Sequence, residues 1–257
     1  LNYRLKIEST ERYLNHMSAA SGEMEILDTS LDHIEDLLVT AKEAGLAAMN
    51  GTASSEDIST YADKIEQVAD EMFQAANTQV GGKHIFAGYQ EDTVPFAENA
   101  GYDPELYDPV DDTTWPVSYS GDANAKTVEI APGKQVQTAV TGNALFLGDA
   151  DNNGEVDTGS VDLFAVLKNF EHALRNGDEA AMNSGLDQLD QGAEQVRRVR
   201  GRMGNNGWRI ERATEHLENV SLEFKEIISE YEDADALEVL SNIVQQETAF
   251  EAALQVT

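Results

Sequence analysis

The chain has 257 residues, of which 48 are acidic and 17 are basic, so its formal net charge is −31. A surface this acidic repels nucleic acid and anionic lipid, and neither is expected as a partner. No apolar run is long enough to cross a membrane, and the first residues do not form a cleavable signal segment. The absence of Cys excludes disulfides, thiolate catalysis and Cys-ligated zinc.

The first half of the chain predicts a helical hairpin. Apolar and small residues recur in steps of three and four from Tyr3 to Ala41, which is a heptad-like seam. Such a helix is a rod of roughly 70 Å at 1.5 Å per residue. The stretch "NGTASSED" at 50–57 ends it, and Ser54 or Ser55 is the expected N-cap of a second, antiparallel helix with a seam from Ile58 to Gln79.

The middle of the chain has a different composition. All five prolines fall between residues 95 and 132, beside short alternating runs such as "KTVEIAPG" that predict β-strands and tight turns. Helical periodicity returns near Val161. A seam runs from Ile210 to Ala234, slips, and resumes through Ile243, Phe250 and Leu254.

These patterns predict a mainly α protein. We expect an elongated antiparallel bundle of long, coiled-coil-like helices with a compact, small β domain inserted into it. The predicted divisions are 1–91 and 161–257 for the two helical halves and 92–160 for the insertion. One local conflict stands inside the second half, because Gly201, Gly204 and Gly207 each cost about 1 kcal/mol relative to Ala and favour a break or kink.

The acidic loop "DADNNGEVDTGS" at 149–160 resembles a twelve-residue calcium loop. Asp149, Asp151, Asn153 and Asp157 occupy ligand positions, and a Gly stands at the sharp-turn sixth position. The twelfth position is Ser160, where a bidentate Glu belongs, and no entering helix precedes the loop. Two interpretations stay open: a calcium site, or an Asx-turn loop between strand and helix.

Six arginines are clustered in an otherwise acidic chain: Arg197, Arg198, Arg200, Arg202, Arg209 and Arg212. They could bind an acidic face of a neighbouring copy, as a subunit interface. Equally, they could form pairs with acidic helices of the same chain. No serine elbow, metal-binding His spacing or other catalytic constellation is present, so we expect no enzyme and no catalytic residue.

The stretch "GGKHIFAGYQ" at 81–90 fits neither a dinucleotide fingerprint nor a phosphate loop. We interpret it as a structural joint in which one glycine caps the second helix and apolar side chains anchor the start of the extended segment. The joint residues are Gly81, Gly82, Ile85, Phe86, Gly88 and Tyr89.

Four stretches in the same order resemble the bacterial flagellin superfamily, and most of all its hook-filament junction members. They are "ANTQVGGKHIFAGYQ", "VSYSGDANAKTVEIAPGKQVQTAVTGNALF", "VRRVRGRMGNNGWRIERATEHLENV" and "YEDADALEVLSNIVQQETAFEAALQVT". His84 stands where the family more often has Tyr. The family pattern has further helical segments at both ends, so the resemblance implies a core fragment that is soluble and deficient in assembly.

The resemblance implies a structural component of the flagellum that joins hook to filament. Its expected partners are neighbouring copies in a ring, the adjoining hook-associated protein, flagellin and a type III export chaperone. It implies an extracellular protein that is exported by the flagellar type III route without a cleaved signal peptide. The alternatives are a filament flagellin and, from another class, a calcium-binding extracellular adhesin or coiled-coil binding module.

Overall fold

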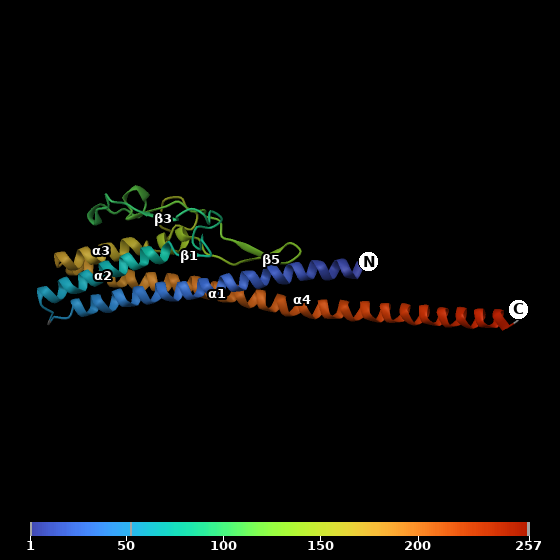
Figure 1. The fold of residues 1–257 in the computed structure, drawn as a ribbon. Helices are drawn as coiled ribbons and strands as arrows, with labels where there is room; N and C mark the ends of the chain where they lie inside the picture. Colours follow the sequence, from blue (N-terminus) through green and yellow to red (C-terminus); the bar gives the residue numbers. More distant parts are fainter. Residues whose placement is uncertain (1, 52, 256–257) are drawn as a thin grey trace.

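The chain folds into an elongated helical bundle with an irregular insertion on one face (Figure 1). This computed structural model describes residues 2–51 and 53–255, and the side chains of 3–51, 53–231 and 240–246. The four helices are α1 (Asn2–Ala48), α2 (Ser55–Ala76), α3 (Leu163–Asn176) and α4 (Glu179–Gln255). α1 and α4 run lengthwise beside each other, and α2 and α3 pack on them at the end away from the chain termini. The predicted fold class is confirmed.

The helix ends follow local sequence chemistry. Ser54 caps α2, as expected: its hydroxyl accepts the N–H of Asp57, whose carboxylate in turn accepts the N–H of Ser54. Asp162 caps α3 by accepting the N–H groups of Phe164 and Ala165. Gly177 ends α3 in the left-handed conformation, with φ of 67°.

α4 passes through Gly201, Gly204 and Gly207 without interruption, so the kink that local chemistry favours is wrong. The reason is packing against α1. Met203 and Ile210 are buried on the same stretch of helix, and Gly207 lies against Met24 of α1. Burying one such side chain is worth about 1.5–3 kcal/mol, which exceeds the cost of a single helical glycine.

Gly45, Gly185 and Gly192 leave space for a large side chain from a neighbouring helix. The ring of Phe170, from α3, lies directly over Gly45 of α1 and Gly185 of α4, and a Cβ atom at either glycine would stand closer than 3.0 Å to it. Leu163 lies in the same way over Gly192 of α4. The three helices therefore approach closely because these positions carry no side chain.

The predicted β region is confirmed, and in the described part of the chain it consists of three separate hairpins rather than one compact sheet. β1 (Gln79–Val80) pairs with β2 (Lys83–His84), β3 (Phe96–Glu98) with β4 (Val117–Tyr119), and β5 (Thr127–Ala131) with β6 (Lys134–Gln137), all antiparallel. Short 3₁₀ turns lie at 104–106 and 112–114, and a π-helical turn lies at 143–147. The first hairpin falls inside the segment expected to be helical.

A cluster of aromatic rings holds the insertion on the bundle. The ring of Phe146, in the π-helical turn, lies with its centroid 5.1 Å from that of Phe86 and 5.4 Å from that of Phe96. Phe164 of α3 stacks on Phe146 at 5.6 Å and contacts Phe96 at 5.4 Å. All four rings are buried. This cluster, rather than a continuous sheet, gives the inserted segment its core.

Candidate functional site

The structural joint is a β-hairpin, not a helix cap. α2 ends at Ala76 with Asn77 as its C-cap, so the prediction that Gly81 or Gly82 caps this helix is wrong. The two glycines instead form the turn between β1 and β2, with φ of 60° and 83°. A two-residue hairpin turn of type I′ requires positive φ at both positions, and Gly adopts it without steric cost.

His84 is buried within this joint and is hydrogen-bonded on both sides of its ring. Nδ1 lies 3.0 Å from the carbonyl oxygen of Asn77, and Nε2 lies 2.8 Å from Nε2 of Gln79. A carbonyl can only accept, so Nδ1 carries the proton and Nε2 accepts from the Gln79 amide. The imidazole ties the end of α2 to the hairpin, which is a structural role.

The rest of the joint divides into a buried and an exposed part. Phe86 is fully buried in the aromatic cluster, and Ile85 packs partly against the core. Gly88 has φ of 65°, and a side chain there would press against the carbonyl oxygen of Asp122. Tyr89 is 58% exposed, so the prediction that it anchors the turn is wrong for this residue.

The acidic loop is held by its own side chains, and Asn153 forms an Asx turn by accepting the N–H of Glu155. Both carboxylate oxygens of Asp149 accept backbone N–H groups, from Asn153 and Gly154, each at 2.9 Å. Burial raises the pKa of Asp149, and these two donors act against that shift. The Asp157 carboxylate accepts the N–H of Ala150, and the Asp151 carboxylate accepts from the Asn153 amide.

These residues do not fit a calcium site. Calcium needs six to eight oxygen ligands directed at one point, whereas the oxygens of Asp149 and Asp157 are directed at the backbone of the loop itself. Within residues 2–51 and 53–255, no three acidic or histidine side chains are grouped to hold a metal ion. The loop connects the π-helical turn to α3.

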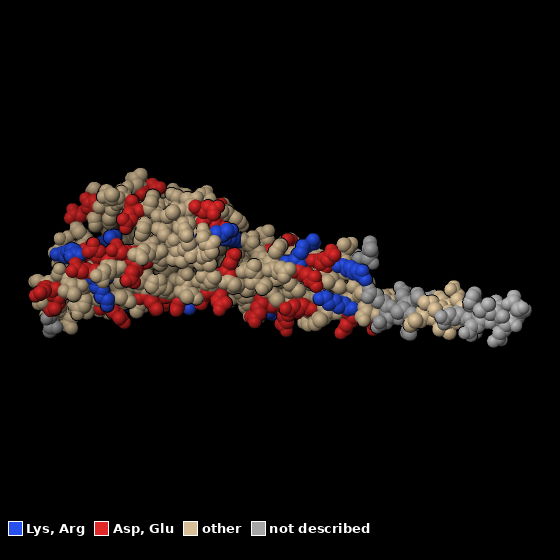
Figure 2. Space-filling model, in the orientation of Figure 1, with Lys and Arg blue, Asp and Glu red and all other residues tan. Residues whose placement is uncertain are grey.

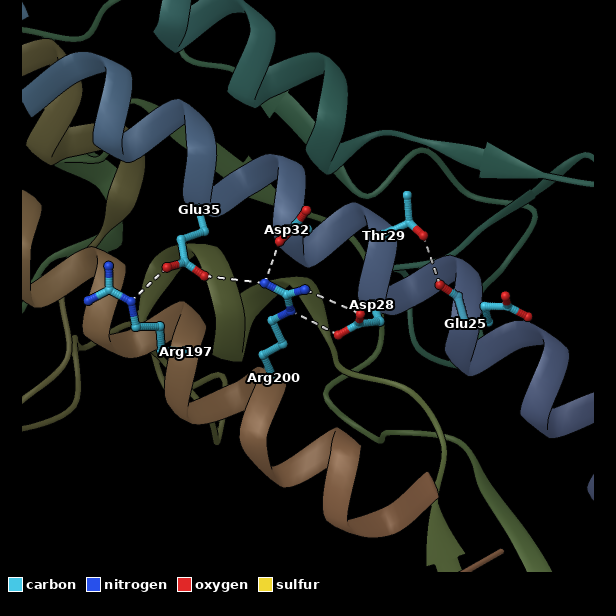
Figure 3. A network of polar contacts seen from close by, with 7 residues as sticks. All are labelled: Glu25, Asp28, Thr29, Asp32, Glu35, Arg197 and Arg200. Carbon is cyan, nitrogen blue, oxygen red and sulfur yellow. Dashed lines mark hydrogen bonds and ion pairs between the residues drawn. The ribbon is translucent and has the colours of Figure 1, made fainter. Parts of the chain in front are cut away.

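Two of the clustered arginines pair with α1 of the same chain. Figure 3 shows Arg200 of α4 directed at three carboxylates on successive turns of α1, those of Asp28, Asp32 and Glu35. Arg197 also binds Glu35, with Nε 2.6 Å from the carboxylate. These charge-assisted hydrogen bonds raise the pKa of both guanidinium groups. Arg197 and Arg200 therefore follow the intramolecular interpretation.

The other four arginines of the cluster are exposed on a different side of α4. Arg198 donates only to the carbonyl oxygen of Gly159, at 3.3 Å. The guanidinium of Arg212 lies 4.9 Å from the ring centroid of Trp208, which is itself 56% exposed. Considering the described side chains alone, none of Arg198, Arg202, Arg209 and Arg212 has a carboxylate within ion-pair distance.

Gln195 of α4 is a buried polar contact that periodicity alone does not reveal. Its amide nitrogen donates to the carbonyl oxygens of Leu145 and Val161, and its amide oxygen accepts the N–H of Val161. These bonds join α4 to both ends of the acidic loop. In the sequence, the signal for this contact is an isolated Gln at a core position of a helical seam.

α4 extends beyond the start of α1 (Figure 1). The ring of Tyr3 contacts that of Phe224 at 5.6 Å, close to the amino end of α1. Further along α4, Tyr231, Leu240 and Ile243 are exposed. The predicted seam residues Ala234, Phe250 and Leu254 lie outside the described side chains.

Comparison with known proteins agrees with this architecture. Residues 2–91 match the bacterial flagellin N-terminal helical region. The chain is 25% identical over 248 residues to flagellar hook-associated protein 3 of Escherichia coli (strain K12), a match that covers 91% of this chain and 73% of the relative. The chain is a distant homologue of flagellar hook-associated protein 3.

A second relative supports the same homology, and a solved structure has the same fold. Hook-associated protein 3 of Salmonella typhimurium is 23% identical to the chain with the same coverage. The crystal structure of flagellar hook-associated protein 3 from Legionella pneumophila has the same fold, with a TM-score of 0.74, 13% identity, and coverage of 90% of this chain and 98% of that one. The predicted resemblance is confirmed, and the homology to hook-associated protein 3 places the chain among flagellin-like structural proteins rather than enzymes.

Proposed function

We propose that this protein joins the hook of a bacterial flagellum to its filament. The observation that carries the proposal is the homology to hook-associated protein 3, which extends over 91% of the chain and includes both α1 and α4. A filament flagellin would share the N-terminal helical region. It would not account for two curated relatives that are both hook-associated protein 3.

The shape of the molecule supports a role in a tubular assembly. α1 and α4 form one long rod, and the end of α4 and the start of α1 lie toward the same end of it (Figure 1). Rods of this kind pack side by side through their long faces. The inserted hairpins cover one face of the rod near its other end.

The proposed function implies three kinds of partner. They are neighbouring copies in a ring, an adjoining hook-associated protein on one side and flagellin on the other. Before assembly, an export chaperone would bind the chain. We place the assembled protein outside the cell, after export through the flagellar type III channel without a cleaved signal peptide. Within residues 2–51 and 53–255, none of the helices is long and apolar enough to cross a membrane.

Deletion of the encoding gene tests the proposal. Electron microscopy of the deletion strain should reveal hooks that lack filaments, with flagellin released into the medium. Expression of the gene from a plasmid should restore the filaments. If the deletion strain loses its hooks, or retains filaments of normal length, the junction role is wrong; loss of the filament subunit itself would indicate a flagellin.

A further inference from the structure

Two complementary surfaces lie on opposite sides of α4 over the same stretch of the helix. The first, which we name the Arg ridge, consists of Arg198, Arg202, Arg209 and Arg212, and Trp208 lies between it and the groove. The second is a groove between α1 and α4, of about 990 Å³, lined by residues from both helices. Within the described part of the chain, the groove is open, and the Arg ridge makes one contact, from Arg198 to the carbonyl oxygen of Gly159.

The Arg ridge is a continuous basic surface. Arg198, Arg202 and Arg209 recur at intervals of four and seven residues, which keeps them on one face of the helix. Trp208 and Arg212 border this face, with the indole ring under the guanidinium. Exposed Trp and Arg side chains together are typical of the centre of a protein interface, because each buries a large area and forms directed contacts.

The groove has the opposite charge and a small-residue lining. Ser18 and Ser21 of α1 face Gly204 and Gly207 of α4, which leaves space between the helices. The rim carries acidic side chains that have no cationic partner among the described residues: Glu25, Glu211, Glu215 and Glu218. Acidic side chains also line the outer edge of the helical rod in Figure 2. The flexible side chains of Met24 and Met203 also line the groove and can adapt to an inserted side chain.

The two surfaces lie at similar heights along α4 and face opposite sides of it, so neighbouring copies can use both. Arg202 and Glu211 are nine residues apart, about two and a half turns, and so they point to opposite sides of α4. The Arg ridge spans 198–212 and the α4 side of the groove spans 203–218, which is a difference in height of roughly 9 Å or less. A second copy that lies alongside with its axis parallel can therefore present its Arg ridge to the groove of the first.

We propose that copies of this chain associate side by side, with the Arg ridge of one copy in the α1/α4 groove of the next. The two surfaces differ, so the contact is heterologous and repeats from copy to copy, which produces a ring or an open helical array. This proposal rests on the proposed function for its setting. The opposite charges of the two surfaces select the second copy as the occupant.

Crosslinking of introduced cysteines tests the arrangement, because the chain has no Cys of its own. Asn205→Cys lies on the exposed side beside the Arg ridge, and Ser21→Cys lies in the groove. Under mild oxidation, the purified concentrated chain should form a covalent dimer when the two variants are mixed, and neither variant alone should do so. A mixture of Asn205→Cys with Ser59→Cys, on the exposed surface of α2, is the control for random collision.

Charge exchange gives a second, independent measurement. Added to the cysteine chains, Arg202→Glu with Arg209→Glu should reduce the mixed crosslink about tenfold or more, and so should Glu211→Arg with Glu215→Arg. When the chain with Arg202→Glu and Arg209→Glu is mixed with the chain with Glu211→Arg and Glu215→Arg, the two surfaces again have opposite charges, and the crosslink should return. Circular dichroism checks that each variant is folded.

The outcomes separate this proposal from the proposed function. A dimer formed by Asn205→Cys alone would mean a symmetric contact and would overturn the proposal. A mixed dimer no more abundant than the Ser59→Cys control would also overturn it. In either case, restoration of the filaments by the plasmid-borne gene would still support the junction role. A deletion strain with normal filaments would refute that role but would not affect the crosslinking result.

Discussion

Replacing Gly185 with Ala should weaken the bundle, although Ala is the better helix former. Ala in place of a helical Gly contributes about 1 kcal/mol. At Gly185, however, the new Cβ atom would lie closer than 3.0 Å to the buried ring of Phe170. Overpacking of this kind costs about 1–3 kcal/mol, because the rigid ring, packed between α1 and α4, has to shift as a whole.

Gly201 provides the matched control, since it lies in the same helix and has no atom within 4 Å of its Cβ position. Gly201→Ala should stabilise the protein by about 1 kcal/mol. Gly185→Ala should therefore be less stable than Gly201→Ala by about 1–3 kcal/mol. Urea unfolding followed by far-ultraviolet circular dichroism measures both values.

A smaller partner should relieve the effect. In a double-mutant cycle, Gly185→Ala should cost less in the Phe170→Leu background than in the natural chain, with a coupling of about 0.5–3 kcal/mol. Equal stabilisation by Gly185→Ala and Gly201→Ala, or no coupling to Phe170, would refute the close-packing argument.

Three further perturbations have defined outcomes. Gln195→Ala leaves the N–H of Val161 buried without its acceptor, so unfolding in urea should show a loss of about 1–3 kcal/mol and hydrogen exchange should show loss of protection at that amide. Burial raises the pKa of Asp162 to about 7. The folded chain therefore keeps a proton on this carboxyl that the unfolded chain loses above about pH 4. The free energy of unfolding should fall as the pH rises from about 4 to about 7. Asp162→Asn should flatten this part of the pH profile, and an unchanged profile would refute the assignment. Arg200→Ala breaks partly exposed ion pairs with α1, so the loss should be within about 1 kcal/mol and should shrink in high salt; a loss that does not depend on salt would contradict it.

The long helices could be predicted because their signals are local and repeated. The seam from Tyr3 to Ala41 and the N-cap at Ser54 are both readable from neighbouring residues, and the structure agrees with both. The predicted kink near Gly204 is wrong because the contact that decides it is not local. Whether three glycines interrupt a helix depends on what packs against it, and here α1 lies alongside from a distant part of the sequence.

The candidate site was less predictable because its decisive contacts join distant residues. Gly81 and Gly82 suit a helix cap and a hairpin turn equally well, since both need positive φ. The pairing of Gln79 with His84 decides between them. Likewise, the arginine cluster looks uniform in sequence, and only the position of Asp28 and Glu35 on α1 separates Arg197 and Arg200 from the exposed members.

The antiparallel pairing of α1 with α4 also sets the order in which the protein can fold. Glu35 meets Arg197 only after 162 intervening steps along the chain, and Met17 meets Thr214 after 197. Contacts so distant in sequence require closure of very long loops and form late. Under the proposed export through a channel, the seam of α1 would stay without its main partner until α4 had followed, and the rod would close only outside the cell.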